Sequence, residues 1–136
     1  MSQTALLVID VQNDYFPQGK MELFCAEQAL KHINRLEDLF IKREQPIIYI
    51  QHIANQPNAT FFEAGTQGVA LHSGLRVKAD SIVIEKHYPN SFFQTTLKAE
   101  LERLNVDKLV ISGMMTHMCV DATSRAAAEF AYQPTI

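Results

Sequence analysis

Four short runs of apolar residues punctuate the chain. They are rich in β-branched residues, lack alternation of apolar and polar positions, and cover residues 5–9, 46–50, 81–84 and 108–112. Strands covered on both faces have this pattern, whereas strands with one solvated face alternate. The chain is therefore predicted to contain four buried strands of a parallel sheet.

Helical patterns fill the intervals between these runs. Apolar residues at three- to four-residue spacing predict an amphipathic helix over residues 26–43, and Pro46 lies just beyond its end. Another helix is predicted to begin near Cys119 or Val120, with small and aromatic residues along one side. Helices and strands thus follow one another in turn.

The interval before the fourth run predicts a further helix. Ser91 and Gln94 form a capping-box pattern, apolar residues continue to Leu104, and Asn105 suits a left-handed helix end. Residues 55–73 contain proline and glycine and show no period. They are expected to form a long functional loop.

The alternation of strands and helices predicts a three-layer α/β/α, Rossmann-like fold with right-handed crossovers. No repeat or linker divides the chain, so residues 1–136 are expected to form a single domain. The sequence ends at residues 133–136, where a fifth strand would begin. We therefore expect either a four-stranded sheet or a shortened form of a longer domain.

Composition narrows the range of partners. The chain has 12 Lys and Arg residues against 15 Asp and Glu residues and no basic cluster, which argues against binding nucleic acid or anionic membranes. No apolar run is long enough for a signal sequence or a membrane span. Cys25 and Cys119 are expected to be free thiols in the reducing cytoplasm, and small molecules are the expected partners.

Polar residues follow the predicted strands at equivalent places. Asp10 ends the first strand, His52 follows the second, Lys86 follows the third, and residues 113–119 follow the fourth. Ligands of open parallel sheets bind outside the carboxyl ends of the strands. An acid, a base and a thiol are therefore predicted to meet at one edge of the sheet.

Cys119 is the candidate nucleophile of this group. At the start of a helix, unpaired amides and the helix dipole favour a thiolate, and Lys86 would lower the thiol pKa further. Asp10 would oppose the thiolate unless it acts as the proton acceptor. Each residue alone has an ordinary structural explanation, but their joint placement favours a nucleophile, a charge partner and a general base.

Three segments resemble the isochorismatase-like cysteine hydrolases. Residues 10–16, DVQNDYF, resemble the opening motif of that family, and Glu85-Lys86 followed by Ser91-Phe92 resembles its lysine segment. Residues 112–120, SGMMTHMCV, resemble its nucleophile turn. The matches are in order and span nearly the whole chain.

The resemblance implies specific roles and a specific fold. Asp10, Lys86 and Cys119 would form the catalytic triad, and the Met114–Met115 peptide bond would be cis. The backbone amides of Met115 and Cys119 would form an oxyanion hole. The family sheet has six strands in the order 3-2-1-4-5-6, so strands five and six would be missing here, and family members are commonly homo-oligomers.

Differences within the family narrow the chemistry. Nicotinamidase-type members carry an Asp-x-His metal segment after the second strand, but this chain has Gln51-His52 there, so neither a catalytic metal at His52 or His72 nor a cofactor is expected. Members that cleave isochorismate typically lack the cysteine. Cys119 therefore favours hydrolysis of an amide-type C–N bond through a thioester.

Other hypotheses remain open. They are a vinyl ether hydrolase of the isochorismatase type, a non-catalytic binding domain, and a thiol-redox protein, which the lack of a Cys-x-x-Cys motif disfavours. His117 is an alternative base for Cys119. The expected walls of a substrate pocket are mostly aromatic side chains: Phe16, Phe61, Phe62, Tyr88 and Phe92, with His117.

Overall fold

A parallel five-stranded sheet forms the centre of the molecule. The computed structural model describes residues 3–56, 58–130 and 132–135, without the side chains of residues 116 and 117. The spatial order of the strands is β3-β2-β1-β4-β5. Their bounds are β1 (Gln3–Ile9), β2 (Ile47–His52), β3 (Ile82–Lys86), β4 (Val106–Gly113) and β5 (Gln133–Thr135).

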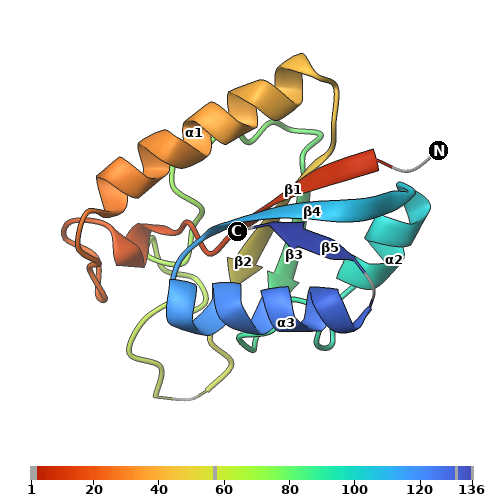
Figure 1. Cartoon of the computed structure of the whole chain (residues 1–136). Coiled ribbons are helices and arrows are strands. Elements are labelled where there is room, and N and C mark those ends of the chain that lie inside the picture. Colours follow the sequence, from red (N-terminus) through yellow and green to blue (C-terminus); the bar gives the residue numbers. More distant parts are fainter. Residues whose placement is uncertain (1–2, 57, 131, 136) are drawn as a thin grey trace.

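Helices cover both faces of this sheet, as predicted. Helix α1 (Ala26–Lys42) lies on one face, and α2 (Leu97–Arg103) and α3 (Asp121–Glu129) lie on the other (Figure 1). A 3₁₀ turn, Asn13–Tyr15, follows β1, and a π-helical turn, Thr116–Val120, precedes α3. None of the described helices is long and apolar enough to cross a membrane.

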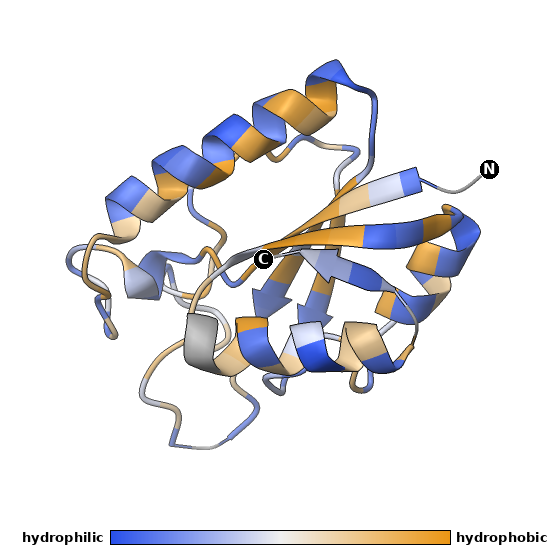
Figure 2. Cartoon of the chain, in the orientation of Figure 1, coloured by the Kyte–Doolittle hydropathy of each residue, from blue (hydrophilic) through white to orange (hydrophobic). Residues whose placement is uncertain are grey.

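The two faces of β1 explain its uninterrupted apolar run. Leu6 and Val8 pack in the core beneath α1, whereas Leu7 and Ile9 pack in the core beneath α2 and α3. All four side chains are completely buried. The apolar colouring of the central strands, against the mixed colouring of the outer helices, shows the same arrangement (Figure 2).

Helix α2 begins later than the sequence indicates. Ser91 does not cap a helix, because its amide donates a hydrogen bond to Thr123 Oγ1 over 2.9 Å and its side chain is buried against the same hydroxyl. Regular helix therefore starts only at Leu97. The helix ends where predicted, and Asn105 has the left-handed conformation, with φ of 56°.

The prediction that the fifth strand is missing was wrong. Gln133–Thr135 pairs in parallel with Lys108, Leu109 and Val110 of β4, so part of that edge is covered. Strand β3 also extends two residues further than predicted, to Lys86. The lysine therefore projects from the end of the sheet itself.

Candidate active site

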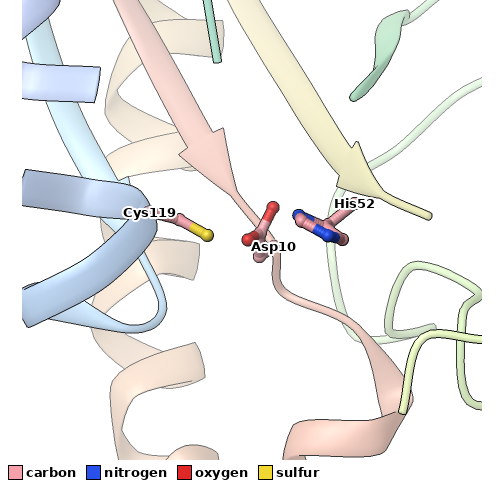
Figure 3. Close-up of side chains that lie close together, drawn as sticks. All are labelled: Asp10, His52 and Cys119. Carbon is pink, nitrogen blue, oxygen red and sulfur yellow. The ribbon is translucent and has the colours of Figure 1, made fainter. Parts of the chain in front are cut away.

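Four side chains meet at the carboxyl end of the sheet. Asp10 directly follows β1, His52 and Lys86 end β2 and β3, and Cys119 lies in the turn before α3. In Figure 3, Cys119 and His52 point toward the Asp10 carboxylate from opposite sides. The structure thus brings together the three residues predicted as a triad and adds His52.

Close backbone packing allows this approach. A Cβ atom on Gly113 would lie 2.1 Å from the Ile9 carbonyl oxygen, and Gly113 has φ of 133°, so only glycine fits here without strain. The Met114 amide then donates to Ile9 O over 2.9 Å. These contacts join the end of β4 to the end of β1 and bring the cysteine turn beside Asp10.

Lys86 occupies the centre of the group. Its side chain is completely buried. Nζ contacts four groups, namely Asp10 Oδ2 at 3.2 Å, Cys119 Sγ at 3.2 Å, His52 Nδ1 at 2.9 Å and the Tyr88 carbonyl oxygen at 3.0 Å. An ammonium ion has three protons to donate and no acceptor, so the four neighbours share its three protons as acceptors.

Asp10 keeps one oxygen unpaired. The carboxylate is completely buried, and within the described residues Oδ1 has no hydrogen-bond partner. Burial raises the pKa of Asp10, and this effect outweighs the attraction of Lys86 and the hydrogen bonds from Cys119 and Lys86. Asp10 is therefore a stronger proton acceptor than an ordinary aspartate.

The thiol of Cys119 differs from its expected state. Burial, followed by the charge of Asp10, raises the pKa of Cys119 to about 12, although Lys86 acts in the opposite direction. The expectation of a stabilised thiolate was therefore wrong, because only about 5% of the residue is exposed. The thiol is therefore protonated at neutral pH and lies beside the Asp10 carboxylate.

The turn before Cys119 has a defined backbone. The Met114–Met115 peptide bond is cis. The Met115 carbonyl oxygen accepts hydrogen bonds from the Met118 amide at 3.1 Å and from the Val120 amide at 3.3 Å. The backbone from Met115 to Cys119 is thus held as a compact loop that carries the thiol.

A buried glutamine, which the sequence analysis missed as a site residue, holds His52. Gln12 Nε2 donates to the His52 carbonyl oxygen at 2.8 Å, and the His52 amide donates to Gln12 Oε1 at 2.8 Å. Gln12 Nε2 also donates to Val69 O at 2.7 Å, so the amide ties β2 and the following long loop to β1. In the sequence, the one indication of this role was that Gln12 lies two residues after Asp10.

A cavity of about 450 Å³ borders the group through His52. Phe61, Phe62 and Tyr88, three of the residues predicted to line a substrate pocket, supply its aromatic wall. Two other residues predicted to line a substrate pocket, Phe16 and Phe92, do not line this cavity. Phe16 lies on His72, with ring centroids 4.1 Å apart, and Phe92 packs on Phe130 at 5.2 Å.

The side chain of His117 lies outside the described part of the structure. The prediction that it lines the pocket, and the alternative that it is the base for Cys119, therefore remain predictions.

Asp10, His52 and Cys119 also offer donor atoms that a metal ion accepts. One such atom from each lies within 4.8 Å of the others. Lys86 Nζ, however, contacts all three side chains, so an ammonium ion already lies among these donors. A metal ion would have to displace this ammonium or bind its deprotonated amine.

Comparison with known proteins gives a consistent result. The model of the isochorismatase domain matches residues 4–136. YddQ, an uncharacterized isochorismatase family protein of Bacillus subtilis, is 47% identical over 95% of this chain, which covers 72% of YddQ. Isc1, a secreted isochorismatase effector of Verticillium dahliae, is 31% identical over 93% of this chain, which covers 65% of Isc1.

Two more distant relatives are named for hydrolytic reactions. Streptothricin hydrolase of Streptomyces noursei is 27% identical over 95% of this chain, which covers 46% of that protein. Ureidoacrylate amidohydrolase RutB of Acinetobacter baylyi is 26% identical over 90% of this chain, which covers 64% of that protein.

A solved structure has the same fold and confirms the predicted architecture. The isochorismatase hydrolase of Oleispira antarctica superposes with a TM-score of 0.92 at 37% identity, over 98% of this chain and 74% of that one. The matching domain model, the similar sequences and this structure agree along almost the whole length. The chain belongs to the isochorismatase family.

Proposed function

We propose that this chain is a cysteine-dependent hydrolase that cleaves an amide-type C–N bond of a small molecule. One observation carries the proposal: a buried thiol and a carboxylate with an unpaired oxygen share the same lysine Nζ, at 3.2 Å from each. This arrangement provides a nucleophile, a base and a fixed positive charge. Two relatives, one named as a hydrolase and the other as an amidohydrolase, support it.

The first half of the reaction forms a thioester. Asp10 takes the proton of Cys119 as Sγ attacks the substrate carbonyl carbon, so that a C–S bond forms. The amides of Met115 and Cys119 hold the oxyanion. Asp10 then returns its proton to the leaving nitrogen as the C–N bond breaks, and the amine departs.

The second half restores the enzyme. Water attacks the thioester carbon, Asp10 accepts a proton from the water, and the C–S bond breaks to release a carboxylic acid. The proton then passes to Sγ. Lys86 stabilises the negative charge as it moves between Asp10 and Cys119, because its Nζ lies 3.2 Å from both groups.

Mass spectrometry and ammonia release test this proposal. Small carboxamides, beginning with nicotinamide, acetamide and butanamide, are incubated with the protein, and an acid quench traps the thioester. We expect ammonia release and an acyl adduct on Cys119 that Cys119→Ala abolishes and Cys25→Ala retains. Ammonia release of equal rate in Cys119→Ala would exclude the covalent mechanism.

A second assay tests the alternative that the protein hydrolyses a vinyl ether. Pyruvate release from isochorismate is measured for the wild type and Cys119→Ala. Pyruvate formation that does not depend on Cys119, without release of ammonia from any amide, would replace the proposed reaction by vinyl ether hydrolysis.

A further inference from the structure

The lysine contact determines the proton position on His52. Nδ1 of His52 lies 2.9 Å from Nζ of Lys86. An ammonium ion can only donate, so Nδ1 must be the acceptor and the ring proton of a neutral imidazole must lie on Nε2. Burial, with the charges of Lys86 and His87, lowers the pKa of His52 to about 4, which agrees with a neutral ring.

The second ring nitrogen of His52 is left available. Within the described part of the chain, Nε2 makes no hydrogen bond to protein, and His52 forms part of the wall of the 450 Å³ cavity. A ring nitrogen also lies within 4.8 Å of both a carboxylate oxygen of Asp10 and Sγ of Cys119. The His52 ring therefore lies between the reacting groups and the cavity.

The position of this donor is fixed from three sides. Gln12 holds the backbone of His52 through two hydrogen bonds, and Lys86 holds Nδ1. The ring centroid of Phe62 lies 5.7 Å from that of His52. A donor held in this way discriminates between ligands, because an unmatched polar group loses its hydrogen bond to water without replacement.

The charge of the cavity wall indicates which kind of ligand acceptor atom the cavity can accommodate. Among the described residues that line it there is no Asp, Glu, Lys or Arg. An anionic ligand group would therefore meet no fixed positive charge in this wall, whereas an uncharged oxygen needs only one donor.

We propose that His52 determines specificity by donating from Nε2 to an uncharged acceptor atom of the substrate, close to the scissile carbonyl. The substrate class is thus a neutral carboxamide with an ether, carbonyl or similar oxygen beside the reacting group. This inference rests on the proposed function for its kinetic consequence, but the tautomer and the binding contact do not depend on turnover.

Two substitutions distinguish the roles of the two ring nitrogens of His52. His52→Asn places an amide oxygen near the position of Nδ1, so it keeps an acceptor for Lys86 and loses the donor in the cavity. His52→Gln places an amide nitrogen near the position of Nε2, so it keeps that donor. A residue that only positions Lys86 would tolerate Asn better than Gln, and a substrate-binding donor would show the reverse.

The kinetic test uses a matched pair of amides. In 2-methoxyacetamide an ether oxygen replaces one methylene group of butanamide. We expect the wild type to prefer 2-methoxyacetamide in kcat/KM by about 3- to 10-fold, the value of one hydrogen bond, mainly through KM. His52→Asn should lose this preference and His52→Gln should keep it; a preference retained in His52→Asn would overturn the proposal.

Nuclear magnetic resonance tests the contact without turnover. The ¹⁵N signals of His52 in the unmodified protein at pH 7 should show the Nε2–H tautomer, and 2-methoxyacetamide, but not butanamide, should shift the Nε2 signal. An Nδ1–H tautomer, an imidazolium, or equal responses to both amides would overturn the inference. A selective response without ammonia release would retain this binding site and reject the proposed hydrolysis.

Discussion

Two carboxylates are completely buried in different parts of the molecule, Asp10 at the carboxyl end of the sheet and Glu37 on the buried face of α1. Both oxygens of Glu37 are hydrogen-bonded: Asn34 Nδ2 donates to Oε1 at 2.8 Å, and the Tyr49 hydroxyl and the Arg76 amide donate to Oε2 at 2.5 and 2.8 Å. Asp10 has Lys86 on Oδ2, and its Oδ1 is unpaired within the described residues.

Under the proposed mechanism, this difference separates a structural acid from a reactive one. Buried polar atoms are almost always hydrogen-bonded, so Glu37 follows the general rule and joins α1 to β2 and to the loop at Arg76. An unpaired buried oxygen costs free energy that stability alone does not explain. Asp10 retains the capacity to accept a proton, and in the proposed mechanism the thiol of Cys119 supplies it.

Removing the thiol should have the largest effect on activity. Cys119→Ala eliminates the attacking atom, so we expect kcat/KM for a hydrolysed amide to fall by about 10³-fold or more, as for other covalent nucleophiles. Cys25→Ala is the matched control, because Cys25 is exposed and makes no contact with Lys86, and should retain wild-type activity. Equal losses in the two variants would contradict the assignment.

Asp10→Asn should have the next largest effect. The substitution preserves the shape of the side chain and removes the proton acceptor, so kcat should fall by about 10² to 10⁴-fold, the usual contribution of a general base. Circular dichroism and urea unfolding establish how much of the variant is folded. A folded variant with nearly wild-type kcat would mean that another group deprotonates Cys119.

The sequence predicted the meeting of Asp10, Lys86 and Cys119 because it follows from local patterns and one topological rule. Apolar runs locate the strand ends, and the carboxyl ends of parallel strands lie at the same edge. Strand β5 escaped prediction because Gln133–Thr135 contains only three residues, and its pairing depends on β4 rather than on its own pattern.

Contacts across the fold limited the remaining predictions. The clamp between Gln12 and His52 joins residues 40 positions apart, and the contact between Ser91 and Thr123 that delays α2 joins residues 32 positions apart. The thiol pKa was misjudged for a related reason. Helix position and charge are visible in the sequence, but the depth of burial that outweighs them depends on packing of the whole domain.

Glu37→Gln should affect stability rather than catalysis. Glutamine retains one acceptor oxygen and replaces the other by a donor that faces the existing donors, so the free energy of unfolding should fall by about 1 to 3 kcal/mol. Urea unfolding measures this loss. Amide hydrolysis by the folded variant should stay within twofold of the wild type, and a selective loss of kcat would remove the distinction between Glu37 and Asp10.

Alkaline unfolding tests the raised pKa values of the Cys119 thiol and of Tyr49, the partner of Glu37. The folded pKa of Cys119 is raised from the ordinary 9.0 to about 12, so the protonated thiol favours the folded state. This contribution is complete below pH 9 and is lost as the pH rises from 9 toward 12, by up to about 1.4 kcal/mol per pH unit.

Cys119→Ser isolates that contribution, because it lacks the titrating thiol. Burial and the hydrogen bond to Glu37 also raise the pKa of Tyr49. Tyr49→Phe removes this second titrating group and is therefore the matched control. In urea unfolding at pH 8, 9 and 10, the free energy of unfolding should depend less on pH for Cys119→Ser than for the wild type. Tyr49→Phe should change this pH dependence separately. If the free energies of unfolding of the wild type and Cys119→Ser changed with pH in parallel, burial in the folded protein would not raise the pKa of the Cys119 thiol.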